Sequence, residues 1–191
     1  MTPAVVVAPL PPREYWEKRY RQGGTSGVAS RGDEVAMKVG AAAAFAKQIG
    51  AKRVLDFGCG DGIFGKMLLE HFPCDYEGLD FSPSAVQLAS EHFPTREGGV
   101  EFLLGTEERW DLVLCFDVLF HVVTKAEHDA MVDGLFRVAT RGVQILTWGP
   151  VMNGVEVAPH NCYWPVTLPD TAVKTVATPF LNKMFLEAEL P

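Results

Sequence analysis

The chain has 191 residues, of which 48% are hydrophobic and 21% are charged, so its composition excludes a disordered or fibrous protein and is typical of one soluble globular domain. Its 17 basic and 24 acidic residues give a formal net charge of −7. This balance argues against avid binding of a nucleic-acid backbone, which needs a broad positive field.

Neither the cysteines nor the apolar segments indicate a secreted or membrane protein. The cysteines lie far apart, without a C-x-x-C pair: Cys59, Cys74, Cys115 and Cys162. We therefore expect reduced thiols, no metal site and a cytoplasmic protein. Residues 1–12 lack a basic start and contain several prolines, so they predict a loose arm rather than a signal peptide. No stretch approaches the roughly 20 apolar residues of a membrane span.

The first half of the chain predicts two helices and then alternating strands and helices. Residues 14–21 predict a helix that ends at Gly23-Gly24, and the Ala-rich residues 33–49 predict a second one. The following elements are expected as a strand over 53–57, a helix over 60–70, a strand over 76–80 and a helix over 83–91. Ser82-Pro83 supplies the N-cap and first turn of the last of these helices.

The second half continues the same alternation. We expect strands over 100–104, 111–116 and 142–148, with a helix to about residue 138 between the last two. Thr124 and Glu127 form a capping box at the start of that helix. After a loop over 150–169, two closing strands are expected near 173–177 and 183–189. Continuous apolar strands alternating with helices predict an α/β fold with a doubly wound, mostly parallel sheet.

A glycine-rich turn follows the first strand. That strand ends at Asp56, and Gly58, Gly60 and Gly62 follow at alternate positions. Glycines in a strand-to-helix turn let the backbone approach a nucleotide-like ligand closely. A dinucleotide motif G-x-G-x-x-G is absent when counted from Gly58 but present at 60–65, one turn late for a pyrophosphate. A nicotinamide-dependent oxidoreductase therefore stays open as an alternative.

The segment Val54-Leu-Asp-Phe-Gly-Cys-Gly-Asp-Gly62 resembles the first motif of class I S-adenosylmethionine-dependent methyltransferases. Asp80, at the end of the second predicted strand, matches the acidic residue that accepts hydrogen bonds from the ribose hydroxyls in this family. The alternative is that Asp80 is only a turn carboxylate. The resemblance implies S-adenosyl-L-methionine as the cofactor and a Rossmann-like fold. The cofactor-binding residues that it implies in this part of the chain are Asp56, Gly58, Cys59, Gly60, Asp80 and Phe81.

The N-terminal arm carries a second resemblance. Residues 15–25 are similar to the arm of thiopurine and tellurite-resistance methyltransferases, which folds over the cofactor. Trp16 and Tyr20 are four residues apart, so both rings lie on one helical face. With Thr25 and Gly27, they are implied to close over the methionine end of the cofactor. An aromatic pair that only docks the arm on the sheet is the alternative.

One position departs from the family pattern. Methyltransferases of this class usually carry an acidic residue after the third strand, where it holds the adenine amino group. With the third strand expected over 100–104, Thr106 takes that place and Glu107 follows it. We expect both residues to bind the cofactor, and the departure leaves the adenine contact open.

Residues 110–122 resemble the fourth motif of the family and are expected at the reacting end. Phe116, Asp117 and His121 follow the strand whose carboxyl end should face the ligand. His121 is the candidate catalytic base and Phe116 a cofactor contact, whereas Asp117 is expected to position rather than to take a proton. His121 could instead hydrogen-bond a neighbouring loop, and His160 is a second, lower-ranked candidate base.

We therefore expect one methyltransferase domain over residues 1–191 that acts on a small-molecule acceptor at O, N or S. Within it, residues 1–32 form the arm, 33–149 the cofactor-binding core, and 150–191 the acceptor-side loop and closing strands. Phe-Asp-Val-Leu-Phe at 116–120 does not fit the [DNS]-P-P-[YFW] motif of amino-methylating DNA enzymes. A methyltransferase of protein or RNA and a non-catalytic binding module of the same fold stay open as alternatives.

Overall fold

In the part of the chain that the structure describes, seven strands form one sheet in the order β3-β2-β1-β4-β5-β7-β6. The computed structural model describes residues 11–148, 166, 173–177 and 183–191. The bounds of the strands are β1 Arg53–Phe57, β2 Asp75–Asp80, β3 Thr95–Glu97, β4 Trp110–Phe116, β5 Ala139–Trp148, β6 Val173–Ala177 and β7 Lys183–Glu189. The first five strands run parallel, and β7 pairs antiparallel with both β5 and β6. This is the predicted doubly wound, mostly parallel sheet.

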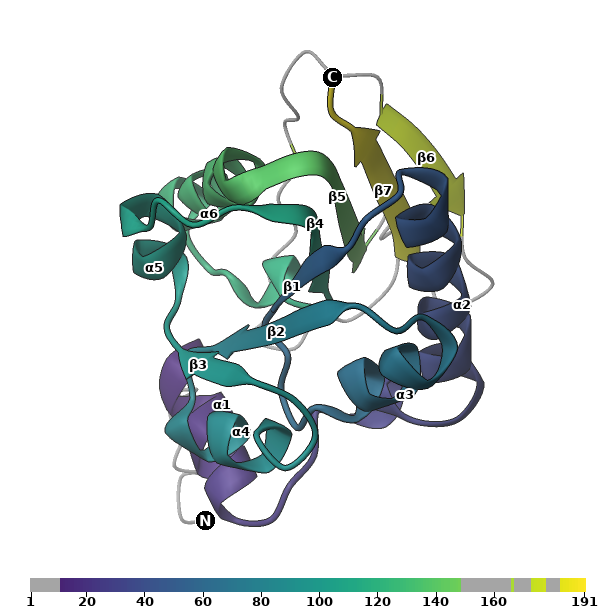
Figure 1. Ribbon diagram of the computed structural model, residues 1–191. Coiled ribbons are helices and arrows are strands. Elements are labelled where there is room, and N and C mark those ends of the chain that lie inside the picture. The colour runs from purple at the N-terminus through teal and green to yellow at the C-terminus, as the bar shows by residue number, and fades with distance from the viewer. Residues whose placement is uncertain (1–10, 149–165, 167–172, 178–182) are drawn as a thin grey trace, which may run out of the picture.

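Helices cover both faces of the sheet (Figure 1). Their bounds are α1 Pro12–Arg21, α2 Gly32–Gln48, α3 Ile63–His71, α4 Pro83–Ala89, α5 Val100–Gly105 and α6 Lys125–Val138, with the short 3-10 helices η1 Val28–Ser30 and η2 Leu119–His121. Helix α2 packs beside α3 and α5 packs beside α6, while α1 lies against α4. The arm is thus a helix that rests on the edge of the domain near β2 and β3.

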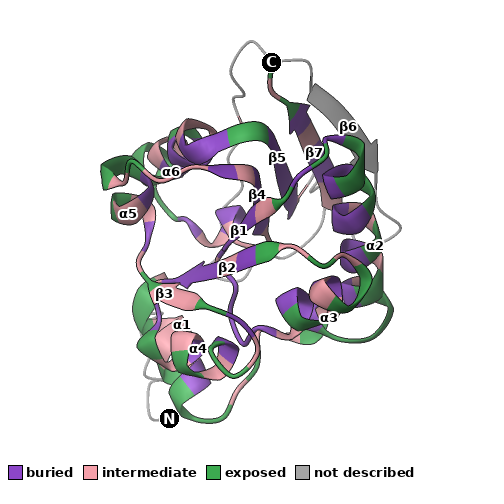
Figure 2. Ribbon diagram, viewed as in Figure 1, coloured by how far each residue is buried: buried purple, intermediate pink, exposed green. Residues whose placement is uncertain are grey.

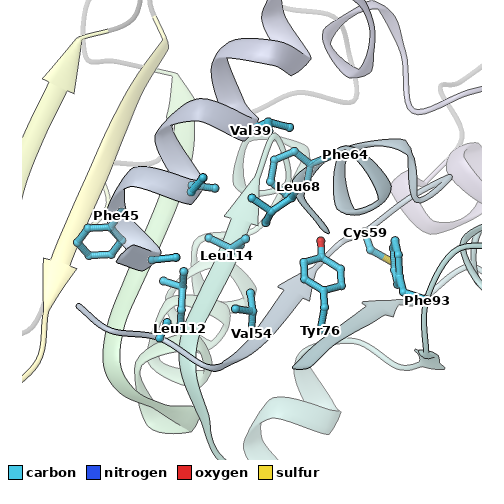
Figure 3. Close-up of a cluster of buried hydrophobic side chains, with 14 of the residues drawn as sticks. Val39, Phe45, Val54, Cys59, Phe64, Leu68, Tyr76, Phe93, Leu112 and Leu114 are labelled. Carbon is cyan, nitrogen blue, oxygen red and sulfur yellow. The ribbon is translucent and has the colours of Figure 1, made fainter. Parts of the chain in front are cut away.

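Successive side chains of a strand point to opposite sides of the sheet. Because helices cover both sides, the central strands are buried on both faces (Figure 2). In β4, Leu112 and Leu114 join the core under α2 and α3, whereas Val113 and Cys115 join the core under α5 and α6. Figure 3 shows the first of these clusters, in which side chains of α2 and α3 meet those of β1 and β4. The packing keeps the carboxyl ends of β1, β2 and β4 in fixed relative positions.

The expected third strand over residues 100–104 is wrong. Residues Val100–Gly105 form helix α5, and the third strand is the short Thr95–Glu97. A run of five apolar-rich residues does not distinguish a strand from a buried helix turn. Leu103 faces the sheet from α5, fully buried against the core. The expected helix over 60–70 also begins later, at Ile63, because Gly60 and Gly62 have positive φ of 57° and 79° and cannot join a right-handed helix.

The other elements agree with the sequence patterns. Ser82 caps α4 by accepting a hydrogen bond from the Ala85 N–H at 3.1 Å, and Thr124 caps α6 by accepting one from the Glu127 N–H at 3.3 Å. Both closing strands form as expected, at Val173–Ala177 and Lys183–Glu189. The candidate base His160 lies outside the described residues.

None of the helices within the described ranges reaches the length and hydrophobicity that a bilayer crossing requires. The same part of the chain holds no group of three or more His, Cys, Asp and Glu side chains arranged to bind a metal.

Candidate active site

The turn after β1 brings the backbone close to neighbouring elements. Gly58 has a φ of +79°, and a Cβ at this position would lie 2.3 Å from Val118 Cγ2. Gly60 has a φ of +57°, and its Cβ would lie 2.3 Å from Ser26 Oγ. Only glycine satisfies both the conformation and the spacing here. The turn is therefore enclosed by the end of β4 on one side and by the arm on the other.

Asp80 lies at the end of β2, beside this turn. Its carboxylate accepts hydrogen bonds from the Gly60 N–H at 3.0 Å and from the Ser82 N–H at 2.9 Å, and the residue is buried. Burial raises the pKa of Asp80 to about 6, although both amide donors act in the opposite direction. Asp80 is thus a buried carboxylate with a raised pKa that is hydrogen-bonded to the glycine turn.

The arm is fastened to the glycine turn by a reciprocal pair of hydrogen bonds. The Ser26 N–H donates to Asp61 Oδ2 and the Asp61 N–H donates to Ser26 Oγ, both at 3.0 Å. Tyr20 contacts Ser26 through the two hydroxyls, 3.0 Å apart, and Arg31 pairs with Asp61 at 2.9 Å. Burial disfavours the ionised form of Asp61, but the hydrogen bonds from Arg31 and Ser26 outweigh it and lower the pKa of this carboxyl.

A second contact fastens the arm beside Asp80. Glu17 of α1 accepts hydrogen bonds from the hydroxyls of Ser82, at 2.6 Å, and Ser84, at 2.8 Å. On the inner side of the same helix, the rings of Trp16 and Tyr20 stack with centroids 5.8 Å apart, and Trp16 meets His121 edge-on at 5.0 Å. The arm therefore spans from the end of β2 to the segment after β4.

These elements enclose a cavity of about 530 Å³ at the carboxyl ends of β1, β2 and β4. Most of the residues predicted to bind the cofactor line it, together with the candidate base. They are Trp16, Tyr20, Gly27, Asp56, Gly58, Cys59, Asp80, Phe81, Phe116 and His121. The structure thus brings together residues from four separate segments of the chain.

Four other predicted residues do not line the cavity: Thr25, Gly60, Thr106 and Glu107. Thr25 is exposed, and Gly60 reaches the site through its N–H to Asp80. Glu107 forms an ion pair with Arg137 at 3.1 Å, on the side of α5 and α6. Thr106 and Glu107 lie away from the cavity because the third strand was predicted at the wrong residues. Strand β3 ends at Glu97, so the cavity wall next to it is formed by Gly98, Gly99 and Val100.

The lining of the cavity near the end of β4 also contains two lysines that sequence analysis did not identify. Asp117 follows β4 with a φ of +59°, and its carboxylate contacts the ammonium groups of Lys38 from α2 and of Lys183 from β7. The Lys183 contact measures 2.8 Å. A lysine in the middle of the Ala-rich face of α2 was the available signal, because a lone charge there is costly to bury without a partner.

Asp56 forms the floor beneath the glycine turn. Its carboxylate accepts a hydrogen bond from the Tyr76 hydroxyl at 2.7 Å, and both side chains are buried. Burial raises the pKa of Asp56 to about 7, against the effect of this hydrogen bond. Burial likewise raises the pKa of the Cys59 thiol, so this thiol is not poised as a nucleophile.

The cavity is suited to a ligand that has both a polar nucleoside part and a less polar part. The carboxylate of Asp80, held by the backbone amides of Gly60 and Ser82, supplies hydrogen-bond acceptors to the cavity. Aromatic rings of Trp16, Phe116 and Phe120 supply apolar walls of the same cavity. His121 is a titratable group that lines the same space.

Comparison with known proteins gives one family match and several curated relatives. The family described as "Methyltransferase domain" matches residues 54–142. Ubiquinone biosynthesis O-methyltransferase of Coxiella burnetii (strain RSA 493 / Nine Mile phase I) is 31% identical over 78 residues, which are 37% of this chain and 33% of the relative. Its counterpart in Azorhizobium caulinodans is 34% identical over 77 residues, or 37% of this chain and 30% of the relative. The matches thus span about a third of the length of these relatives.

Solved structures match nearly the whole chain at low sequence identity. Magnesium protoporphyrin IX methyltransferase from Synechocystis PCC 6803, with bound SAH, aligns with a TM-score of 0.66 and 19% identity, covering 93% of this chain and 97% of that one. The N-methyltransferase NodS from Bradyrhizobium japonicum WM9, also in complex with S-adenosyl-l-homocysteine, has a TM-score of 0.68 and 12% identity, covering 95% and 100%. At these identities the likeness describes the fold.

Proposed function

We propose that this chain, whose residues 54–142 match the family described as "Methyltransferase domain", is an enzyme that transfers a methyl group from S-adenosyl-L-methionine to a small-molecule acceptor. The observation that carries this proposal is the pairing of the glycine turn with Asp80. The two are joined by the hydrogen bond from the Gly60 N–H to Asp80 Oδ2, and both stand at one cavity. A carboxylate has two oxygens that accept hydrogen bonds only, which suits the two hydroxyls of a ribose.

The surrounding residues suit the rest of an adenosyl cofactor. The ring of Phe81, which follows Asp80, lines the cavity with the guanidinium of Arg13 5.4 Å from its centroid. We assign the adenine to the space beside Phe81 and Gly98-Gly99. Trp16 and Tyr20 then cover the sulfonium part of the cofactor from the arm.

Methyl transfer from a sulfonium needs alignment more than acid catalysis. The acceptor atom forms a bond to the methyl carbon as the carbon–sulfur bond breaks, and the electron pair of that bond stays on sulfur to give the neutral thioether. The protein must hold acceptor, methyl and sulfur in line. For a hydroxyl acceptor, we assign its proton to the imidazole of His121, which lines the cavity against Trp16.

The acceptor that the cavity suits best is a small molecule with an apolar body. Its walls on the side of His121 carry Val118, Phe120, Val122 and Met131. The curated relatives named above are O-methyltransferases of ubiquinone biosynthesis, and with them we favour an oxygen acceptor on an apolar, aromatic compound. An RNA acceptor is disfavoured by the net charge of −7.

The proposal is tested by titrating the protein with S-adenosylhomocysteine and, separately, with NADH in a calorimeter. Binding of S-adenosylhomocysteine without binding of NADH is expected. NADH binding alone would favour an oxidoreductase, and binding of neither would favour a non-catalytic module. Formation of S-adenosylhomocysteine from S-adenosylmethionine is then measured with a panel of phenolic acceptors, where turnover of at least one is expected.

A further inference from the structure

Aromatic rings form a continuous series from the arm to the end of β5. The ring of Trp16 in α1 meets the imidazole of His121 at a centroid distance of 5.0 Å, and His121 meets the ring of Phe120 at 4.5 Å. Phe120 in turn lies 4.5 Å from the ring of Trp148, the last residue of β5. The candidate base of the proposed reaction therefore stands within a row of rings that begins and ends on different elements.

The imidazole of His121 is contacted by rings from two elements. Trp16 meets it at an interplanar angle of 69° and Phe120 at 58°. The backbone here is the single turn η2, in which the His121 N–H donates to the Val118 carbonyl at 2.9 Å. Rotation of a histidine ring about its Cβ–Cγ bond is broad when nothing restricts it. The two neighbouring rings therefore restrict the directions in which the imidazole nitrogens can point.

The orientation of this ring matters because its two nitrogens are in different environments. Nδ1 of His121 is buried, although the residue lines the cavity. A base must come within about 2.6–3.2 Å of the group whose proton it takes. An acceptor in the cavity therefore reaches this imidazole at Nε2. A half-turn of the ring would put a carbon where Nε2 stands, so a base that acts through Nε2 needs a fixed ring.

Trp148 contacts Phe120 from the side of β5. The two rings are stacked, with an interplanar angle of 3°. Phe120 is buried and lines the cavity, whereas Trp148 is half-buried and does not line it. Stacked aromatic pairs attract each other beyond the effect of their buried area. Loss of the Trp148 ring would therefore let Phe120, and with it His121, shift without removing any side chain from the cavity wall.

We propose that Phe120 and Trp148 are positioning residues, which hold the imidazole of His121 against the arm with Nε2 directed at the acceptor. In the reaction, the hydroxyl proton of the acceptor moves to Nε2 as the oxygen forms its bond to the methyl carbon. The electron pair of the broken carbon–sulfur bond stays on sulfur. This inference rests on the proposed function and adds the residues through which the arm and β5 set the orientation of the base.

Two phenols of similar size and different acidity test the inference. At about pH 8, 4-isopropylphenol keeps its proton, because its pKa is near the phenolic value of about 10, whereas 4-nitrophenol has largely lost it. Only the first phenol needs a base. In Trp148→Leu, turnover of 4-isopropylphenol is expected to fall about tenfold, because a misplacement of about 1 Å can slow a reaction by up to about a hundredfold. Turnover of 4-nitrophenol and the affinity for S-adenosylhomocysteine should both stay within about twofold.

Matched variants separate this role from general effects on folding. Trp148→Phe keeps a ring beside Phe120 and should recover most of the turnover of 4-isopropylphenol. Phe102→Leu is the control and should leave both rates unchanged, because Phe102 is a half-buried aromatic residue of α5 that does not line the cavity. An equal fall with both phenols in Trp148→Leu overturns the inference, because structural damage does not depend on the acidity of the acceptor.

The position of the imidazole can also be measured without an acceptor. Ring currents of the neighbouring aromatic residues displace the NMR signals of the His121 ring protons, which are assigned by their loss in His121→Ala. These signals are expected to move in Trp148→Leu and in Phe120→Leu, while those of His71, an exposed histidine of α3, stay in place. Phe120→Leu carries the test if Trp148→Leu does not fold.

The outcomes distinguish this inference from the proposed function. His121 signals that stay in place in both leucine variants overturn the inference alone. If the unaltered protein turns over neither phenol, the ring signals decide the inference. If it does not bind S-adenosylhomocysteine, the proposed function itself is wrong.

Discussion

The two ends of the cavity hold their carboxylates in different ways. Asp80 accepts from backbone N–H groups that lie 2 and 20 residues away in the sequence. Asp117 is held by side-chain ammonium groups, and its partner Lys38 lies 79 residues away. The first arrangement needs one strand–turn–helix unit and its neighbour. The second needs a helix, a central strand and the last strand of the chain to meet.

From this difference we infer that the two ends have different functions, one in cofactor binding and the other in the reaction. The β2 end presents rigid backbone donors and one carboxylate, an arrangement that fixes a ligand with little loss of side-chain entropy. The β4 end presents long side chains and a histidine next to the apolar wall, where reacting groups are expected. Changes at the β2 end should therefore alter cofactor affinity, and changes around His121 should alter turnover.

The largest expected effect is on turnover in His121→Ala. If this imidazole takes the acceptor proton, its loss should slow methyl transfer by about a hundredfold or more, while the affinity for S-adenosylhomocysteine stays within about twofold. Rates with a phenolic acceptor found in the panel provide the measurement. His71→Ala, at an exposed histidine of α3, is the control. Near-normal turnover in His121→Ala would remove the proposed role.

Asp80→Ala should mainly weaken the affinity for S-adenosylhomocysteine, in contrast to His121→Ala, which should mainly slow turnover. Loss of hydrogen bonds to a charged group costs roughly 1.5–3 kcal/mol, which corresponds to a dissociation constant for S-adenosylhomocysteine raised about tenfold to a hundredfold. Calorimetry of this variant is compared with Asp133→Ala, at an exposed aspartate of α6. An unchanged affinity in Asp80→Ala would contradict the ribose assignment and with it the contrast between the two ends.

The pH dependence of cofactor binding sharpens the same contrast. The pKa of Asp80 is raised to about 6 by burial, and only the ionised carboxylate is free to accept from both ribose hydroxyls. Affinity for S-adenosylhomocysteine should therefore be highest above this pKa and fall, by up to about tenfold per pH unit, as the pH drops below it. Titrations from pH 5 to 8, within the range where the protein stays folded, provide the measurement.

Two further variants separate Asp80 from other groups that titrate in this range. Asp80→Ala should flatten the pH dependence. Asp56→Asn should leave it in place, because the Asp56 carboxylate is engaged by Tyr76. A pH profile that is identical in Asp80→Ala and the unaltered protein would assign the titration to another group.

The smallest effects concern glycines and should have opposite signs. Gly40 lies inside α2 with no atom within 4 Å of its added Cβ, so Gly40→Ala should stabilise the protein by about 0.5–1 kcal/mol. Gly58→Ala combines a positive φ with a contact of 2.3 Å to Val118, so it should destabilise the protein by about 1–3 kcal/mol and weaken cofactor binding. Urea unfolding of both variants checks the signs, and a stable Gly58→Ala would mean that the turn is not constrained by β4.

Local sequence patterns predicted much of the fold. The bounds of β1 and of both closing strands were predicted to the residue, and the caps at Ser82 and Thr124 formed as expected. The third strand was not predicted, because its three residues Thr95–Glu97 are polar and the apolar run that follows folds as α5. Thr106 and Glu107 were chosen as adenine contacts because they follow the wrongly predicted strand. In the structure, both residues contact Arg137 instead.

The sequence alone therefore determined the parts of this protein that depend on neighbours along the chain. The glycine turn, the carboxylate that ends the next strand and the helix caps follow from backbone conformation and hydrogen bonding within short segments. Only the tertiary structure decided how the arm closes over the turn and which lysines meet Asp117. Those contacts join residues far apart in the chain, and it is the packing of α1, α2 and β7 against the sheet that sets their geometry.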